Sequence, residues 1–195
     1  MQSDKSKTIR DSEEEDDMFT DIRSKRVIFV AHCVLNQNSI SDGTADYPGS
    51  NVNVIHALMD AQVGIVQMPC PELCCLGLDR GNIYGAESPV VVENTRIRKE
   101  MQKAPAAVRL AALVEQVMLQ IAEYHKYGFE ILGIVGINRS PCCGVDTTSD
   151  HDSEIKGQGI FIEGIQEALA EAKLSIPVIG IKSMTDGVER VQALL

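Results

Sequence analysis

Cysteine follows a short apolar run at three separate places in this sequence. Cys33 comes after "RVIFVAH", Cys70 comes after "QVGIVQMP", and the pair Cys142 and Cys143 lies in the turn "RSPCCG" after "EILGIVGI". Short apolar runs rich in β-branched residues predict buried strands. In a parallel sheet the loops at the carboxyl ends of the strands open on one edge, so we expect these thiols to converge there. Three convergent thiolates suit a soft metal centre.

The spacing of these cysteines leaves three interpretations open. Iron–sulfur clusters are normally held by cysteine thiolates, and three protein ligands would leave one iron open for a substrate. Zinc bound by three cysteines and one histidine is the competing metal site, with His32, His56, His125 and His151 available. The third interpretation is that the thiols are small buried apolar groups, as free cysteines often are.

The elements that must position these thiols alternate along the chain. Four apolar runs predict strands at residues 26–32, 62–68, 130–137 and 176–181. Helical spacing predicts helices at residues 51–61, 94–127 with a break near Pro105, 157–172, and a closing helix capped by Asp186 or Thr185. The segment "PCPELCCLGLDRGNIYGAE" is rich in proline and glycine and predicts no regular structure. Alternating strands and helices predict a single-domain, Rossmann-like α/β fold with a mostly parallel sheet and helices on both faces.

Composition restricts the class of protein. The chain has 195 residues and a net charge of −10, without tryptophan and without a cluster of basic residues, so we expect no nucleic-acid partner. No run of membrane-spanning length is evident, and we expect no membrane partner. Adjacent cysteines rarely bridge each other, and no secretory signal is visible, which predicts a reduced, cytoplasmic protein. The long apolar helix is compatible with a monomer or a homodimer.

The first 25 residues differ from the rest of the chain. They contain eight acidic and five basic residues and almost no large apolar side chains. Such a segment has little apolar surface to bury, so we expect a disordered acidic tail at residues 1–25 and one folded domain at residues 26–195.

Three motifs resemble the thiouracil desulfurase family and its relatives, over residues 26–172. The matching segments are "HCVLNQ…SDG", "CPELCCLGLDR" and "RSPCCG", and "GQGIF" is a weaker fourth match. The resemblance implies that Cys33, Cys70 and Cys143 bind a [4Fe-4S] cluster with one iron not bound by the protein. That iron would take the sulfur of a small thiolated substrate similar to 2-thiouracil. The implied enzyme is a non-redox desulfidase that replaces C=S by C=O and releases hydrosulfide.

The resemblance also suggests roles for three polar side chains. Glu72 lies two residues from a predicted ligand and would act as general acid and base. Ser140 would hydrogen-bond the substrate or relay a proton, although a turn cap before a proline is its ordinary role. Asp42 is a candidate for substrate contact. Arg80 would pair with a carboxylate or hold the second loop.

The sequence departs from the family pattern beside the second motif. Cys74 and Cys75 stand where the family has two glycines, and Asp79 stands where it has a proline. The substrate pocket is therefore expected to differ. Asn36 and Asn38 are further candidates to line it. Two alternatives to the enzyme remain: a cluster-bearing sulfur carrier without turnover, and a structural zinc protein.

Overall fold

The computed structural model describes residues 19–182 and 186–195. Most of the predicted acidic tail and the candidate cap Thr185 lie outside these described residues. Within the tail, Phe19 is described, and its ring packs edge-on against Tyr127 and Phe129, with centroids 5.7 and 5.6 Å away. Contact with the domain therefore begins before residue 26.

Four parallel strands form the central sheet in the order β2-β1-β3-β6. The strands are β1 (Arg26–Val30), β2 (Gly64–Gln67), β3 (Glu130–Ile137) and β6 (Val178–Ile181). β1 and β3 are buried because helices cover both of their faces, which explains why their sequences are continuous apolar runs. The strand order reverses between β1 and β3, where doubly wound folds place their ligands.

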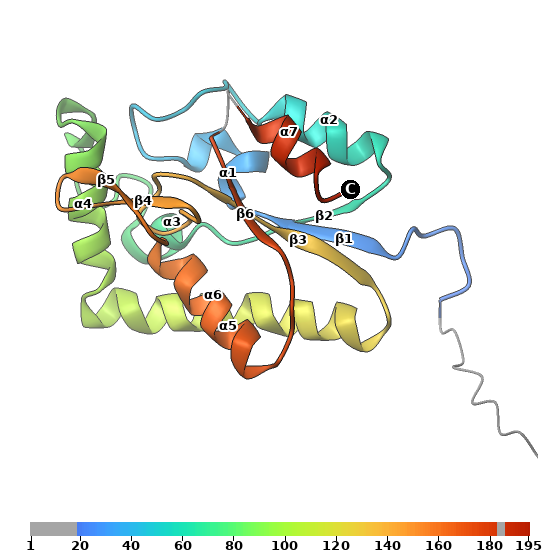
Figure 1. The fold of residues 1–195 in the computed structure, drawn as a ribbon. Coiled ribbons are helices and arrows are strands. Elements are labelled where there is room, and N and C mark those ends of the chain that lie inside the picture. Colours follow the sequence, from blue (N-terminus) through green and yellow to red (C-terminus); the bar gives the residue numbers. More distant parts are fainter. Residues whose placement is uncertain (1–18, 183–185) are drawn as a thin grey trace, which may run out of the picture.

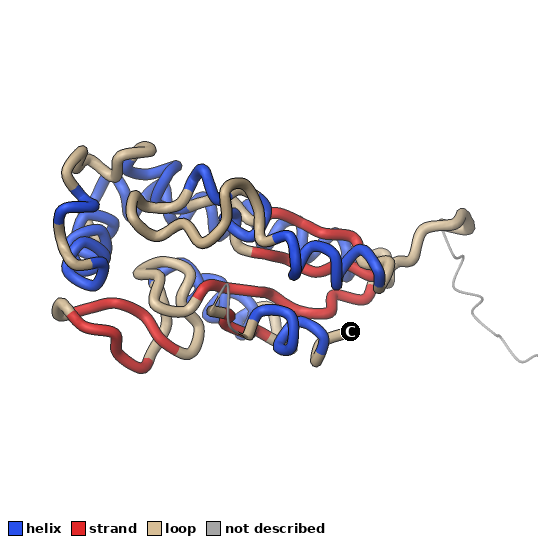
Figure 2. The backbone as a smooth tube through the Cα atoms, turned by 90° about the horizontal axis from the view of Figure 1, so that it is seen from above, coloured by secondary structure: helices blue, strands red, loops and turns tan. Residues whose placement is uncertain are grey.

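Helices cover the sheet on both faces (Figure 1). Helices α5 (Ala104–Lys126) and α6 (Ile160–Glu171) lie side by side on one face, and α2 (Val52–Asp60) and α7 (Gly187–Gln192) lie on the other. Helix α4 (Val90–Met101) stands across the end of α5. Figure 2 looks down on the sheet from above, so that its strands are seen from the side that carries α2 and α7. The prediction of a single-domain Rossmann-like α/β fold is confirmed.

The segment after β2 contradicts the prediction of no regular structure. It contains helix α3 (Pro71–Leu76) and the short 3₁₀ helix η2 (Gly85–Glu87). Proline occupies the first position of α3, where its missing N–H costs nothing, and Gly77 ends the helix with a φ of 88°. Here proline and glycine mark the two ends of a helix.

Four further elements were not expected from the sequence. A one-turn helix, α1 (His32–Leu35), directly follows β1, and the 3₁₀ helix η1 (Gln37–Ser39) follows it. Strands β4 (Thr147–Asp150) and β5 (Ser153–Lys156) form a separate antiparallel hairpin that packs on α4. The predicted helix at 94–127 is two helices, and the break lies before Pro105, as expected.

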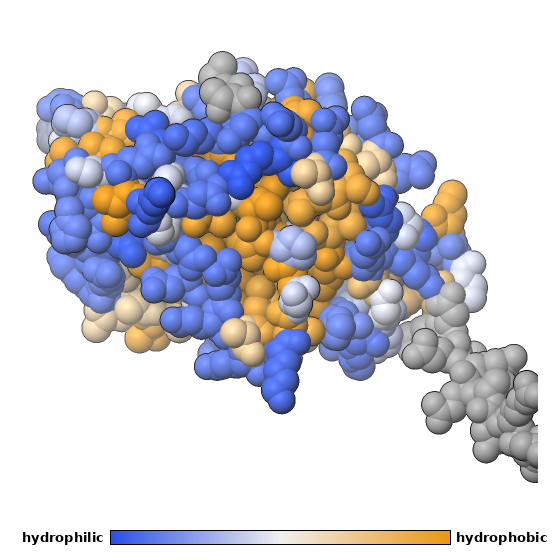
Figure 3. All heavy atoms as spheres, in the orientation of Figure 1, coloured by the Kyte–Doolittle hydropathy of each residue, from blue (hydrophilic) through white to orange (hydrophobic). Residues whose placement is uncertain are grey.

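Helix α5 corrects the expectation that no run has membrane-spanning length. Its 23 residues are long and apolar enough to cross a membrane by length and composition. Instead, α5 packs against α6, α3 and β3 through residues such as Val117 and Ile121, which are completely buried. Only 17% of the 18-residue apolar window of α5 is buried inside the described structure. Apolar side chains also gather around the edge strand β6 on the face shown in Figure 3.

Candidate functional site

The structure places the three predicted cysteine ligands on three loops at one edge of the sheet. Cys33 lies in α1 directly after β1, Cys70 is the N-cap of α3 after β2, and Cys143 lies in the turn after β3. These strands are immediate neighbours, and they are parallel. The Cys70 sulfur accepts a hydrogen bond from the Leu73 N–H at 3.5 Å, which fixes its position at the start of α3.

The three thiols influence each other electrostatically, which shows that they are near neighbours. Burial raises the pKa of Cys33 to about 12, and the nearby Cys70 thiol and Glu72 carboxylate add to this effect. Burial and Glu72 raise the pKa of Cys70 to about 11. The pKa of Cys143 is also raised, first by burial and then by Cys33 and Cys70. A metal centre supplies the positive charge that such thiolates need.

Cysteine thiolates are ligands that both an iron–sulfur cluster and a zinc ion take. Within residues 19–182 and 186–195, no group of three histidine, cysteine, aspartate or glutamate side chains is arranged to hold one metal ion. A tetrahedral zinc site would draw all of its ligands to within about 2.3 Å of a single centre. A four-iron cluster is wider than one ion, so its thiolates stand further apart. Cys33 and Cys70 are partly exposed, Cys143 is buried, and each lies on a separate loop.

The loop after β3 is held by backbone packing. The Ser140 hydroxyl accepts hydrogen bonds from the backbone N–H groups of Cys142 (3.2 Å) and Cys143 (2.9 Å). A Cβ on Gly159 would lie 2.3 Å from the Cys142 carbonyl carbon, and one on Gly136 would lie 2.3 Å from the Cys143 carbonyl oxygen. Only glycine permits these approaches. Ser140 therefore serves as the turn cap that its sequence context allows.

The loop after β2 is held by one buried arginine. Arg80 is 3% exposed, and its Nε pairs with Glu72 Oε2 at 3.3 Å. Its Nη2 donates to the Ser39 carbonyl at 2.5 Å and faces the Cys70 sulfur at 3.7 Å. Its Nη1 donates to the Leu78 carbonyl at 2.8 Å. Both roles considered for Arg80 are therefore present, because it pairs with a carboxylate and also holds the loop.

Glu72 lies between the loops that carry the cysteines. The carboxylate is 7% exposed, and it accepts a hydrogen bond from the Ser41 hydroxyl at 3.2 Å. The Ser140 hydroxyl faces its other oxygen at 3.5 Å. The buried Cys142 thiol also faces this carboxylate, and burial, followed by the charge of Glu72, raises the pKa of Cys142. Glu72 can thus exchange a proton with a group in the cavity while its other contacts hold it in place.

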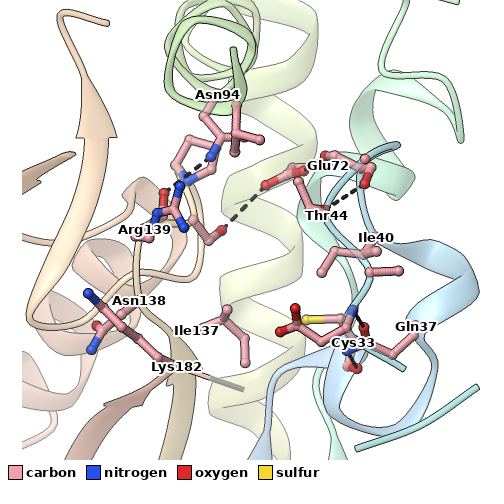
Figure 4. A pocket seen from close by; sticks show the side chains of 17 residues that line it. Cys33, Gln37, Ile40, Thr44, Glu72, Asn94, Ile137, Asn138, Arg139 and Lys182 are labelled. Atoms are coloured by element: carbon pink, nitrogen blue, oxygen red, sulfur yellow. Dashed lines mark hydrogen bonds between the residues drawn. The ribbon is translucent and has the colours of Figure 1, made fainter. Parts of the chain in front are cut away.

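A cavity of about 390 Å³ opens beside Cys33, Glu72 and Ser140. Figure 4 shows two walls, with Ile137 between them. One wall carries Glu72 and Cys33, together with residues of the segment that follows α1. The other wall carries Asn94, Asn138, Arg139 and Lys182. The volume of the cavity lies within the range of pockets that take drug-sized ligands.

Several predicted site residues lie outside this cavity. Asp42 is exposed and lines a separate hollow of about 50 Å³. Asn36 caps the 3₁₀ helix η1 by accepting a hydrogen bond from the Asn38 N–H, and neither side chain lines the cavity. The intervening Gln37 lines it instead, and its Nε2 donates to the Cys33 carbonyl at 2.9 Å.

The basic residues of the cavity were not predicted from the sequence. Arg139 lies two residues after the end of β3, and Lys182 follows β6 directly. The rule that found the cysteines, namely attention to the residues after each strand, would have identified both. Their charge alone gave no signal, since exposed arginine and lysine residues are common on protein surfaces.

The remaining cysteines and histidines have different environments. Cys74 is exposed and Cys75 is buried on α3. His56 and His125 are exposed, and His151 lies in the hairpin turn with its side chain 86% exposed, as expected for a solvated loop residue. His32 is half-buried and begins α1 rather than lying in the first strand, and burial lowers its pKa.

Comparison with known proteins gives one distant relative. The chain is 28% identical to the uncharacterized protein MJ0003 of Methanocaldococcus jannaschii over 158 residues, which are 81% of this chain and 86% of the relative. No family model matches the chain, and no solved structure matches it. The site must therefore be interpreted from its own geometry.

Proposed function

We propose that this protein is an iron–sulfur-cluster-dependent desulfidase that acts on a small thiolated compound similar to 2-thiouracil. The observation that carries the proposal is the convergence of Cys33, Cys70 and Cys143 at the carboxyl ends of three adjacent parallel strands, with a buried carboxylate between their loops. The motif resemblance to the thiouracil desulfurase family points the same way. All six cysteines are free, which is the state expected of a protein in the reducing cytoplasm.

The proposed reaction balances without an oxidant or a reductant. Water adds its oxygen to the thiocarbonyl carbon, and the C–S bond breaks. The sulfur leaves as hydrosulfide with one of the two protons of the water, and the other proton goes to the solvent. When bound, a [4Fe-4S] cluster with three cysteine ligands supplies an iron that acts as a Lewis acid toward the substrate sulfur.

The side chains around the cavity supply the proton transfers. Glu72, held in its ion pair with Arg80, accepts a proton from the attacking water and returns it as the sulfur leaves. Ser140 lies within reach of the Glu72 carboxylate and keeps the turn of Cys143 in position. Glu72 is 7% exposed, so little of its carboxylate is in contact with bulk water.

A sulfur carrier is the second candidate function. The observation that favours it is that the Glu72 carboxylate already has partners in the described structure. It pairs with Arg80 and accepts a hydrogen bond from Ser41. A carboxylate with these partners could simply stabilise the loops around bound hydrosulfide. The enzyme would release hydrosulfide from many substrate molecules in turn, whereas the carrier would hold hydrosulfide without turnover.

Metal content tests the ligand set. Full-length protein would be reconstituted anaerobically with iron and sulfide, and iron, sulfide and absorbance near 400 nm would be measured. We expect Cys33→Ala, Cys70→Ala and Cys143→Ala to lose the cluster, while the matched control Cys74→Ala, on the exposed side of α3, keeps it. Retention of the cluster in Cys70→Ala, or stoichiometric zinc in place of iron, would contradict the proposal.

Hydrosulfide release tests the reaction. Glu72→Gln retains the size of the side chain but cannot accept a proton at neutral pH, so turnover of 2-thiouracil should fall by about 100-fold, with iron content unchanged. Ser41→Ala is the matched control, because it removes a hydrogen bond to the same carboxylate and leaves the carboxylate itself in place. Equal turnover in Glu72→Gln and wild type would remove Glu72 from the mechanism. Absence of turnover in a cluster-loaded wild type would favour the carrier.

A further inference from the structure

The outward side of helix α5 is an apolar surface that nothing within residues 19–182 and 186–195 covers. The helix lies in the outer layer of the molecule, and its inward side packs on the domain through Val117 and Ile121 (Figure 1). On the outward side, Val108 is 71% exposed and Leu119 is 65% exposed. Single exposed apolar residues are normal on a protein surface, whereas a continuous row of them marks an interaction site.

The exposed residues on this side of α5 follow a regular spacing. Seven exposed positions are separated by three and four residues in strict alternation, and we call this row the α5 seam. It consists of Pro105, Val108, Ala112, Glu115, Leu119, Ala122 and Lys126. The alternation of three and four is the heptad spacing with which two helices pack side by side in a coiled coil. The seam therefore has the pattern of a surface that receives another helix.

The charges of α5 balance, unlike those of the whole chain. The helix carries two basic and two acidic residues, so its net charge is zero in a chain whose net charge is −10. Arg109 forms no ion pair within the described part of the chain. Glu123 meets Lys126 of the same helix at 3.7 Å, and both of these side chains are more than half exposed. Two copies that meet through α5 therefore bring neutral helices together rather than acidic surfaces.

The places of Arg109 and Glu123 match an antiparallel pair of α5 helices. Both flank the same edge of the α5 seam, and each lies seven residues from Gln116. When two copies pack antiparallel with Gln116 of each at the centre, Arg109 of one copy lies beside Glu123 of the other, twice. Charged residues at flanking positions set the orientation of paired helices. A parallel pair would give Arg109 no acidic partner, because the other edge of the seam carries Ala111, Met118 and His125.

We propose that two copies of this chain associate through antiparallel α5 helices, in a two-fold interface with two Arg109–Glu123 ion pairs. The proposal concerns assembly and is independent of the proposed reaction. A helix of 23 residues is about 34 Å long, and a strip of that length about 10 Å wide is smaller than the roughly 800 Å² that each partner buries in a stable complex. Glu115 inside the seam lowers the affinity further. The expected dimer is therefore weak, with a Kd in the micromolar range.

Sedimentation equilibrium of the full-length protein tests the association. The wild type should shift from monomer to dimer between about 1 and 300 µM. Leu119→Glu should weaken the dimer at least about tenfold, because it places a charge in the apolar seam. Ile83→Glu is the matched control, since Ile83 is 71% exposed in the loop after α3, and it should leave the dimer unchanged. Equal thermal midpoints of the two variants would show that both fold.

Charge exchange tests the antiparallel orientation. Arg109→Glu and Glu123→Arg should each weaken the dimer about tenfold, because each places like charges side by side. An equimolar mixture of these two variants should recover the wild-type affinity, because every facing pair is then of opposite charge. The double variant Arg109→Glu/Glu123→Arg should recover it as well. A parallel pair of helices predicts no such recovery.

Three results would overturn the proposal. They are a wild type that stays monomeric up to about 300 µM, a dimer that Leu119→Glu and Ile83→Glu affect equally, and a dimer that charge exchange does not restore. Flotation with vesicles of phosphatidylcholine and phosphatidylglycerol examines the other occupant of an apolar face, since α5 has the length and composition to meet a membrane. A monomer that binds these vesicles, and loses this binding in Leu119→Glu, would assign the face to lipid instead of a second copy.

Discussion

The loops after β2 and β3 both present a cysteine to the same site, but they are held by different forces. The loop after β2 depends on charged side chains, since Arg80 joins Glu72, Cys70 and three backbone carbonyls. The loop after β3 depends on backbone hydrogen bonds and on glycines that allow close packing, with Ser140 as its cap. A charged network fails when one partner is lost, whereas a packed backbone fails when any atom is added.

Removing the arginine should produce the largest effect. Arg80→Met leaves the buried Glu72 carboxylate without its ion partner, and the free energy of unfolding should fall by about 3–5 kcal/mol. Urea denaturation would measure the loss. The double variant Arg80→Met/Glu72→Gln should recover part of it, because the uncompensated charge is gone. Lys103→Met, which breaks an exposed pair with Glu100, should cost less than about 1 kcal/mol. A similar cost for Arg80→Met and Lys103→Met would contradict the importance of the buried network.

Adding one methyl group should disrupt the other loop. Gly159 has a φ of −75°, so alanine is not disfavoured by backbone conformation, and the whole cost of Gly159→Ala comes from contact with the Cys142 peptide. We expect a loss of about 3 kcal/mol, at the upper end for overpacking, because backbone atoms cannot move aside. Gly49→Ala is the control, since nothing lies within 4 Å of the added atom. If both variants unfold at the same urea concentration, the packing argument is wrong.

Loss of the cap should have a smaller effect on the same loop. Ser140→Ala leaves the N–H groups of Cys142 and Cys143 without their side-chain acceptor, which should cost about 1–2 kcal/mol. Hydrogen exchange of these two amides would report the change directly. Ser41→Ala removes a hydroxyl that donates to Glu72 and should leave the same amides protected. Unchanged exchange in Ser140→Ala would mean that the glycines alone fix the turn.

The smallest expected effect is a loss of stability in acid that involves the loop after β2. Arg96 donates to Glu93 and, through Nη2, to the Arg80 carbonyl at 2.8 Å. The hydrogen bond from Arg96 lowers the pKa of Glu93, and Asn82 lowers it further. A carboxyl with a lowered folded-state pKa stabilises the fold above its unfolded-state pKa and loses that contribution as pH falls through the folded-state value.

The difference in stability between wild type and Glu93→Gln should therefore be constant near neutral pH and vanish in acid. Its size at neutral pH is expected to be at most about 1 kcal/mol, because Arg96 is partly exposed. Thermal midpoints of both proteins from pH 7 to pH 3 would measure it. A difference that grows toward acid would show that this ion pair does not support the loop.

The strands that the sequence predicted correctly are those with continuous apolar runs. β3 was predicted at its observed bounds because helices cover both of its faces, and β1, β2 and β6 were placed within one or two residues at each end. The hairpin β4–β5 was missed because its residues are mostly polar, and β5 is exposed along its length. Helix α3 was missed because proline was interpreted as a breaker, whereas at the first helical position it is favourable.

The sequence predicted only those residues of the candidate site that lie shortly after the end of a predicted strand. The three cysteines, Glu72 and Ser140 follow strands, and the structure brings their loops together. The buried position of Arg80 was not visible, since its partners Ser39 and Leu78 are backbone carbonyls that any sequence could supply. Asp42 lines a second, smaller hollow, while its neighbours Ser41 and Gly43 line the main cavity as well, so its contact with a substrate stays a prediction.

The glycine packing around Cys142 has a consequence for how such a protein can change over generations. Every substitution of Gly136 or Gly159 adds atoms where backbone already lies, so these positions tolerate no drift. The half-exposed Arg139 and Lys182 on the facing wall can change without disturbing that packing. Random variants selected for correct folding should therefore collect substitutions at Arg139 and Lys182 and leave the two glycines unchanged. The scaffold that holds the thiols and the exposed side of the cavity can evolve independently.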